Sequence, residues 1–266
     1  MENASVKLPN LSDKETAHLI PKGVILSGYR GSRAHNTYVT PTDPSSIDDI
    51  DLMSVYVAPL QYYLGLSGVG KNNRGTKEAV LDPYDAVSYE IRKFVYLLLK
   101  GNPNVLSLLW LRENMYIFRH RLGKMLITYR DSFVSKQAYH SFIGYAHGQL
   151  HRMTHGACKG RMGAKRKALV EKHGYDTKNA GHLIRLLRMG IEFLTEGALH
   201  IWRKDAHELK EIKRGLWTLD KVKSESDRLF KLAEEAYIRS HLPAQPNWKQ
   251  AEEMTIAIIK MFHNIK

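Results

Sequence analysis

The amino-acid sequence predicts an α+β protein in which the strands are confined to the first part of the chain. Apolar runs of β-like length occur at residues 23–29, 50–59 and 85–90. After about residue 120 this signal disappears and apolar residues recur with the 3.6-residue period of a helix, most clearly over 183–194. The residues of that segment predicted to share one face are Leu183, Leu186, Leu187, Ile191 and Leu194. We therefore expect a small α+β domain over 1–118 and a helical domain over 119–266.

The punctuation between these segments supports the division. Pro59 ends the second strand, and the glycine-rich basic segment after it is predicted to form a loop or hairpin. "IRKFVYLLLK" predicts a helix that stops at "GNPN", and "VLSLLW" restarts it. "DKVKSESDRLFKLAEEAYIRSH" and "WKQAEEMTIAIIKMFHNIK" predict further helices near the end of the chain.

Composition favours a soluble protein with a polyanionic partner. The 266 residues carry a net charge of +13, which concentrates nucleic acid or nucleotide phosphates around the protein. Cys158 is the only cysteine, which excludes an intramolecular disulfide and suits a reducing cytoplasm. The first residues lack an apolar signal-peptide core, and Lys100, Gly101 and Pro103 interrupt the most apolar stretch, so we expect a cytoplasmic protein with no membrane span.

Two short motifs point to phosphate and metal chemistry. Gly31 and Ser32 follow the first strand at a predicted helix start, where backbone N–H groups and a hydroxyl could bind phosphate. Asp49 and Asp51 sit two positions apart on the second strand, so both carboxylates should point to one face. Such a pair could hold two divalent cations for phosphoryl transfer, whereas an isolated pair could also be a solvated strand entry.

A third acid is expected on the next strand, in "DPYDAVSYEIRKF". Strand alternation places Asp85 on one face and Glu90 on the other. Because the Glu90 face is the more polar, Glu90 is favoured to face the cleft, with Asp85 nearly equal. Either could complete a metal site, or cap the helix that follows (Glu90) or the turn (Asp85).

The ordered set of strand, Gly-Ser, Asp-x-Asp strand and third acid resembles nucleotidyltransferases of the DNA polymerase β superfamily. A closer resemblance, over nearly the whole chain, is to RNA-repair-pathway nucleotidyltransferases. It rests on "GYRGSRAHN", "DDIDLMSV", "YEIRKFVYLLLKGNPNVLSLLW" and "GYDTKNAGHLIRLLRMGIEFLTEG". The resemblance implies a mixed-sheet catalytic domain over 1–118 and a helical substrate-binding domain over 119–266.

The resemblance also implies roles for the residues in these motifs. Gly31, Ser32 and the adjoining Arg33 would contact the nucleotide phosphates. Asp49 and Asp51 would bind Mg²⁺ or Mn²⁺, and the third acid would help to activate the attacking hydroxyl. One departure from the family pattern is His35-Asn36, which replaces an aromatic-Gly pair.

The helical half contributes a basic stripe. Lys178, His182 and Arg185 lie at i, i+4 and i+7 of the helix predicted from "YDTKNAGHLIRLLRM". The alternatives are a solvated basic face and a surface that meets the triphosphate or an RNA backbone; the resemblance favours the second. Basic residues are also concentrated over 151–190, as in a polynucleotide-binding surface.

Two further motifs are given no catalytic role. "GLSGVGKN" (65–72) approaches a phosphate-binding P-loop, but Asn72 replaces the required hydroxyl and no amphipathic helix follows. His140, His147, His151, His155 and Cys158 fall at helical spacing, but four ligands along one helix cannot converge on one zinc ion. We expect these histidines to be structural or to face RNA.

The sequence thus predicts a metal-dependent, RNA-binding nucleotidyltransferase. It would move a nucleoside monophosphate from an NTP, such as ATP, to a hydroxyl, most simply an RNA (tRNA) 3′ end, with release of pyrophosphate. One alternative is a nucleotidyltransferase that acts on a small molecule or a protein. Another is a non-catalytic RNA-binding module on the same fold.

Overall fold

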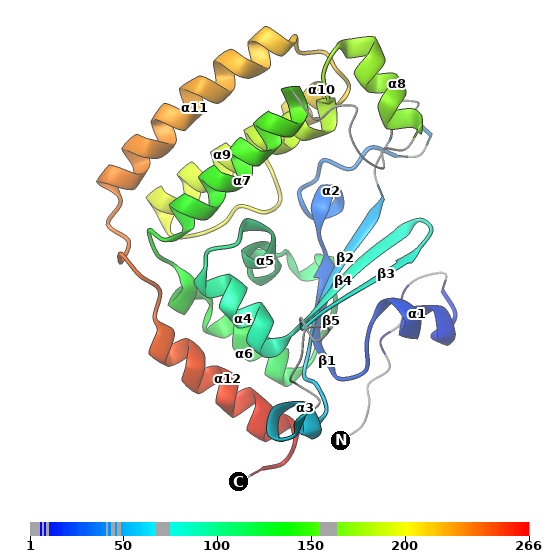
Figure 1. Ribbon diagram of the computed structural model, residues 1–266, viewed down its shortest axis with the longest axis vertical. Helices are drawn as coiled ribbons and strands as arrows, with labels where there is room; N and C mark the ends of the chain where they lie inside the picture. Colours follow the sequence, from blue (N-terminus) through cyan, green and yellow to red (C-terminus); the bar gives the residue numbers. More distant parts are fainter. Residues whose placement is uncertain are drawn as a thin grey trace.

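A computed structural model describes residues 6, 8, 11–40, 42–43, 46, 49–66, 75–154 and 164–265 (Figure 1). The elements up to the last strand are α1 (Asp13–Leu19), β1 (Val24–Tyr29), α2 (Gly31–Ala34), β2 (Ile50–Tyr56), α3 (Leu60–Leu64), β3 (Thr76–Leu81), β4 (Tyr84–Glu90), α4 (Ile91–Leu99), α5 (Pro103–Ser107), η2 (Leu108–Trp110), η3 (Glu113–Met115) and β5 (Tyr116–Arg119). The elements after it are α6 (Arg121–Thr128), η4 (Arg130–Phe133), α7 (Ala138–Thr154), α8 (Ala164–His173), α9 (Thr177–Glu196), α10 (Ala206–Lys213), α11 (Leu219–Arg239) and α12 (Trp248–Phe262).

Within the described residues the strands form one five-stranded sheet in the order β3-β4-β2-β1-β5. β2 and β4 are parallel, and every other neighbouring pair is antiparallel, so the sheet is mixed as expected. The three predicted strands correspond to β1, β2 and β4. The glycine-rich segment contains β3, which pairs with β4 as a hairpin closed at Leu81 and Tyr84. β5 gives no comparable signal in the sequence. The α+β class is therefore confirmed.

The hydrophobic core is shared between the two halves of the chain. The largest cluster of buried side chains joins Met53 of β2 and Phe94 of α4 to Phe193 of α9 and Ile258 of α12. A second cluster lies among α7, α9, α10 and α11, around Leu183 and Leu187. In Figure 1 α12 (red) runs back beside α4 and α6, far from α11. The division at residue 118 stays a prediction.

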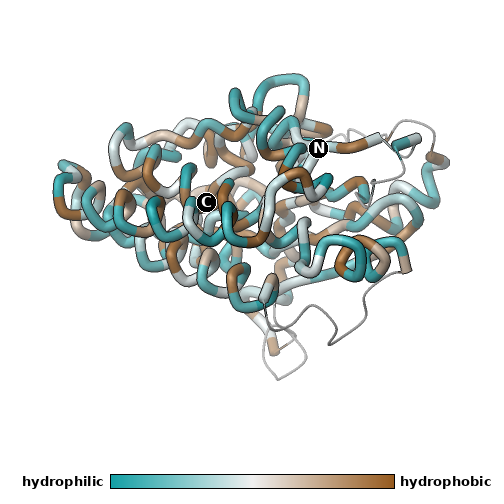
Figure 2. Tube along the Cα trace, turned by 90° about the horizontal axis from the view of Figure 1, so that it is seen from above, coloured by the Kyte–Doolittle hydropathy of each residue, from teal (hydrophilic) through white to brown (hydrophobic). Residues whose placement is uncertain are grey.

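α9 is the central helix of the second half and positions several side chains discussed below. Asp176 caps its start, with the carboxylate accepting hydrogen bonds from the backbone N–H groups of Lys178 (3.1 Å) and Asn179 (3.2 Å). Gly197, at φ +69°, ends it in the left-handed conformation that glycine adopts without strain. Hydrophilic and hydrophobic residues alternate along the helices in Figure 2, as amphipathic packing requires.

None of the helices in the described part of the chain combines the length and the apolar character that crossing a bilayer would require.

Candidate active site

The turn from β1 into α2 packs the backbone directly against a carboxylate. The Arg30 N–H donates to the Asp51 carbonyl at 2.9 Å, which holds the end of β1 beside β2. Gly31 follows with φ +60°, and a Cβ built at Gly31 would lie 2.2 Å from Oδ2 of Asp51. Only glycine satisfies both conditions. The turn therefore places main chain next to the Asp51 side chain.

Ser32 contributes a buried hydroxyl beside this turn. Its Oγ has no hydrogen-bond partner among the described residues and lines a pocket of about 230 Å³ together with Gly31 and Asp51. α2 is only four residues long, so a helix dipole adds less at this point than the sequence suggested. A buried polar group without a partner is costly, so a ligand that accepts from Ser32 would remove this cost.

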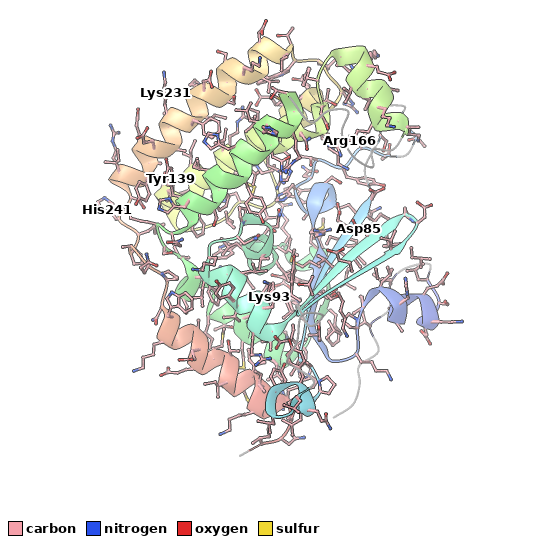
Figure 3. All side chains as sticks on the ribbon, viewed as in Figure 1. Asp85, Lys93, Tyr139, Arg166, Lys231 and His241 are labelled. Atoms are coloured by element: carbon pink, nitrogen blue, oxygen red, sulfur yellow. The ribbon has the colours of Figure 1, made fainter. Side chains whose placement is uncertain are left out.

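Two acids from neighbouring strands meet at one cation. Asp51 and Asp85 are paired in the parallel register of β2 and β4. The Arg30 Nη2 lies 3.5 Å from Oδ1 of Asp51 and 3.7 Å from Oδ2 of Asp85. Figure 3 shows Asp85 at the end of the sheet nearest α2 and the helical half. Asp49 is exposed, just before β2 begins, so the strand on which it was expected starts one residue later. Asp48 lies outside the described residues.

The pKa of the Asp51 carboxyl is raised. Burial is the largest cause; the Arg30 and Lys178 charges act against it, while Asp85 and Asp49 add to it. The ionised form is thus held by cations that do not fully compensate its burial. A further cation at this place would stabilise the ionised carboxylates.

Glu90 does not lie with these acids, contrary to the expectation that it faces the cleft. It pairs with Tyr56 at the other end of the two strands, about 16 Å along the strand from Asp85. Its buried carboxylate accepts from the Tyr63 hydroxyl at 2.8 Å and approaches the Arg92 Nε at 3.5 Å. The alternation was read correctly, but polarity marked the wrong face because Glu90 is satisfied internally.

The predicted stripe of α9 reaches the same pocket. Lys178, His182 and Arg185 all line it, and α10 adds Lys213. The Lys213 Nζ donates to the Thr37 carbonyl at 2.9 Å. His182 is half-buried, and its Nε2 is buried and has no hydrogen-bond partner among the described residues. Burial, then the Arg185, Arg152 and Lys178 charges, hold its pKa well below the usual range, so the ring is neutral.

Arg185 is a buried cation without a carboxylate partner in the described structure. Its Nη1 contacts the His35 ring and lies 3.6 Å from the Met189 sulfur. His35 Nδ1 lies 3.0 Å from the Ile201 carbonyl, so Nδ1 donates and Nε2 faces Arg185 as an acceptor. Burial, and to a smaller extent the Arg203 charge, lower the pKa of Arg185, while Asp51 and Asp205 partly oppose them, and the net pKa is about 9. The guanidinium is therefore suited to an anion supplied from outside the chain.

Some of these residues were not found from the sequence. His35 and Lys213 lie far from each other and from Arg185 in the chain, and neither belongs to a periodic pattern that marks a site. The "GYRGSRA" motif contained Arg30 but gave no reason to single it out. Conversely, Arg33 does not line the pocket, because it lies over the rings of Tyr29 and Tyr38.

The donor set fits a divalent cation of the kind that the resemblance implies. Arg30 already holds a positive charge between Asp51 and Asp85. The backbone at Gly31 lies close to one oxygen of the Asp51 carboxylate, Oδ2. Oxygen ligands of this type suit Mg²⁺, which binds through one or two carboxylates. Within the described residues no group of three or more His, Cys, Asp or Glu side chains is arranged to hold a metal by itself. Phosphate oxygens or water would have to complete the coordination.

The remaining basic residues are partly used inside the fold. Arg166 is paired with Asp176 at 2.6 Å, and Arg188 contacts carboxylates of three residues. His147 stacks on Phe230, with centroids 4.4 Å apart, as a structural histidine would. Residues 155–163, which include His155 and Cys158, and residues 67–74, with most of the P-loop-like segment, lie outside the described residues.

Comparison with protein-family models matches residues 3–251 to the RNA repair pathway DNA polymerase beta family. The chain belongs to this family. Its sheet, its Gly-Ser turn and the acids beside that turn are consistent with the DNA polymerase β-like nucleotidyltransferase fold. No match was found among the curated proteins or among the solved structures.

Proposed function

We propose that the protein transfers a nucleoside monophosphate from an NTP to the 3′-hydroxyl of an RNA, with tRNA the leading candidate, and releases pyrophosphate. Arg185 carries the proposal, because it is a buried cation whose described contacts include no carboxylate and which lines a pocket next to Asp51. Burying such a charge is costly unless an anion completes it. A triphosphate is an anion that could accept hydrogen bonds from this guanidinium.

The pocket as a whole has the charge balance of a triphosphate site. Arg30, Lys178 and Lys213 line it beside Arg185, and Asp51 is the acid among the described lining residues. The Ser32 hydroxyl supplies an additional donor. These groups would orient the phosphates and stabilise charge on the phosphoryl oxygens during transfer.

We assign the metal-binding role to Asp51 and Asp49, and the role of third acid to Asp85 rather than Glu90. Bound Mg²⁺ or Mn²⁺ would neutralise the phosphate oxygens near these carboxylates. The acceptor oxygen would attack the α-phosphorus, the bond to pyrophosphate would break, and Asp85 would accept the proton of the hydroxyl. Asp85 is suited to this because it pairs with Asp51 in register and remains 45% exposed, open to an acceptor.

An RNA acceptor is supported by the net charge of +13 and by the family's RNA repair context. A small-molecule acceptor would not require this charge. Binding of RNA that weakens steeply as salt increases would agree with the RNA acceptor, because phosphate contacts release counterions.

The test is label transfer from each α-labelled NTP, with Mg²⁺ and total cellular RNA, followed by sequencing of the labelled ends. Asp51→Asn and Asp85→Asn should each reduce transfer by on the order of 10³-fold, because metal and proton-transfer interactions supply several kcal/mol. Asp227→Asn is the matched control, since Asp227 is exposed on α11 far from the pocket lining. Glu90→Gln should leave the pattern of labelled ends unchanged.

The outcomes separate the competing functions. Full transfer by Asp51→Asn would exclude the proposed chemistry. Label on protein or on a small metabolite in place of RNA would identify the alternative acceptor class. Absence of turnover with every NTP and acceptor, together with intact RNA binding, would identify a non-catalytic RNA-binding module.

A further inference from the structure

A second pocket, which we call the aromatic pocket, borders the same turn as the phosphate site. Its volume is about 360 Å³. It is lined by the rings of Tyr29, Tyr38 and Trp202, the Arg33 guanidinium, and the amides of Asn36 and Asn114. Gly31, Ser32 and His35 line the first pocket, whereas Arg33 and Asn36 line this one. The α2 segment is therefore a wall between the two pockets.

The rings of the aromatic pocket are paired with cations. The Arg33 guanidinium carbon lies 4.7 Å from the Tyr38 ring centroid and 5.5 Å from that of Tyr29. The Arg112 guanidinium lies 4.5 Å from the Trp202 centroid. Arg33 has a buried Nε without a hydrogen-bond partner among the described residues, and no described carboxylate forms an ion pair with it.

The lining chemistry selects a class of ligand. None of the described lining residues is acidic, and Met115 is the only aliphatic side chain among them. An apolar peptide or lipid chain would find little aliphatic surface there. Aromatic rings and guanidinium planes stack on nucleobases, and amide groups hydrogen-bond to base edges. Guanidinium groups also take a neighbouring phosphate.

Trp202 is connected to the first pocket through its neighbour in the chain, Ile201. The preceding residue, Ile201, accepts the hydrogen bond from His35 Nδ1, and His35 in turn contacts Arg185. The ring that would stack a base is thus tied to the cation that would bind a triphosphate.

We propose that the aromatic pocket binds an unpaired nucleobase together with an adjoining phosphate. The inference rests on the proposed function only for its purpose, since base binding there does not require turnover. The base could come from a single-stranded end of the RNA or from the NTP whose phosphates occupy the first pocket. Stacking in both cases involves the Tyr38 and Trp202 rings.

The test measures binding of a fluorescently labelled single-stranded RNA oligonucleotide without NTP or divalent metal. Tyr38→Ala and Trp202→Ala should each weaken binding about tenfold, the loss expected for one stacked base. Tyr38→Phe should bind as wild type, because the ring remains. Trp248→Ala is the matched control, since Trp248 is a 46% exposed tryptophan on α12 with its own cation, Lys100, 5.9 Å away.

Two additions keep the result independent of folding and of overall charge. Asn114 is exposed, so Asn114→Asp should fold normally and should still weaken binding by placing a negative charge in the pocket. An oligonucleotide with abasic positions has the same phosphates, so wild type and Tyr38→Ala should bind it equally. Equal loss on the abasic strand would overturn base stacking.

A parallel arm uses a non-hydrolysable ATP analogue without RNA. Loss of affinity for the analogue alone in Tyr38→Ala would identify the donor base as the ligand, and loss for RNA alone would identify the acceptor strand. Unchanged affinity for both in folded variants would overturn the proposal. Because neither arm measures transfer, failure here and failure of the catalytic assay are separate results.

Discussion

α9 contains two arginines, three residues apart, whose charges are handled in opposite ways. Arg188 points into a network of acids, with Nη1 2.9 Å from Asp205 Oδ2 and Nη2 3.2 Å from Glu225 Oε1, and it also contacts Glu208. Arg185 lines the pocket beside Asp51, where its described contacts are His35 and a methionine sulfur. One region is electrostatically complete within the fold, and the other is not.

The pKa directions express the same contrast. Burial lowers the pKa of Arg188, but hydrogen bonds from its guanidinium to Glu208 and Asp205 raise it more, so the net pKa is above the ordinary value. At Arg185 burial dominates and the pKa falls to about 9. Burial of an arginine therefore does not by itself indicate that the arginine forms a structural ion pair. The missing carboxylates distinguish an arginine that serves a ligand from one that serves the fold.

The largest change in stability is expected at Arg188, whose charge is balanced by acids within the fold. Arg188→Met would leave three carboxylates of a part-buried network without their shared cation, and should lower the free energy of unfolding by about 3 kcal/mol. Urea denaturation at pH 7 measures this. Arg228→Met is the control, because Arg228 is an exposed partner of Glu225 and its loss should have little effect. Similar stability of the two variants would contradict a stabilising role for the Arg188 network.

Arg185→Met should affect function rather than stability. Removing an uncompensated buried charge should leave the melting temperature unchanged or raise it, because no described carboxylate loses a partner. Affinity for a non-hydrolysable NTP should fall about 30-fold, the value of one charge-assisted hydrogen bond to phosphate. Calorimetric titration and a thermal melt measure the two parts. A large loss of stability with intact affinity would mean that Arg185 is structural.

The pH dependence of NTP affinity tests whether the charge of Arg185 contributes to binding. A basic group whose pKa lies near 9 in the free protein loses its charge as pH rises through that value. Wild-type affinity should therefore fall about tenfold between pH 8 and pH 10 beyond any fall in the variant, since one unit above the pKa is a tenfold change. Arg185→Met retains the other lining residues of the pocket and so corrects for their contribution to the pH profile. Parallel pH profiles would contradict the assignment.

The linkage has a definite sign for stability. The pKa of Arg185 is lowered on folding, so the charged form is disfavoured in the native state below pH 9. This destabilising contribution diminishes as pH rises above about 9, because the unfolded chain, in which the pKa of this arginine is higher, then binds more protons than the folded chain.

The smallest expected effect is a shift in melting temperature, of opposite sign for Asp51 and Asp205. Asp51 has a raised pKa, mainly through burial, so its ionised form costs stability once pH exceeds the folded pKa. Burial alone would raise the pKa of Asp205 as well, but hydrogen bonds from Arg203 and Arg188 lower it by more, so the net pKa is below the ordinary value. The ionised form of Asp205 therefore adds stability that is lost as pH falls through the folded pKa. Without divalent metal at pH 7, Asp51→Asn should raise the melting temperature by a few degrees and Asp205→Asn should lower it.

The controls for this pair follow from the same signs. Both differences should shrink at pH 3, below the unfolded pKa, because both carboxyls are then protonated in the unfolded chain. Scanning calorimetry at the two pH values measures them. Shifts of equal sign at pH 7 would show that the acids are held in similar environments.

Local patterns were sufficient for the elements and for part of the site. Apolar runs predicted β1, β2 and β4, and helical period predicted α9 with its basic stripe, because these signals lie within a single segment. Alternation separated Asp85 from Glu90 but could not choose between them. The choice depends on the register of β4 against β2, which pairs Asp85 with Asp51 and moves Glu90 to the far end. β5 was not predicted, and β3 only through the hairpin alternative for its segment, because both are sheet edges with few buried residues.

The residues that close the pocket were beyond such patterns. The contact of His35 with Ile201 spans 166 positions, and that of Lys213 with Thr37 spans 176. His35 was noted only as a departure from the family pattern and Lys213 was not noted at all, since the residues of a pocket wall depend on the way α9 and α10 pack over α2. The stripe on α9 was found because its three residues, Lys178, His182 and Arg185, share one helix.

The location of Lys213 and Arg185 on late helices has a consequence for biosynthesis. A ribosome makes the sheet acids first and Arg185 and Lys213 only after about a hundred or more further residues, which takes on the order of ten seconds at typical elongation rates. A chain truncated before α9 has the acids and Arg30 but lacks Lys178, Arg185 and Lys213. If these later cations hold NTP as proposed, prematurely terminated products would not sequester it, and nucleotide binding would begin only after most of the chain has been made.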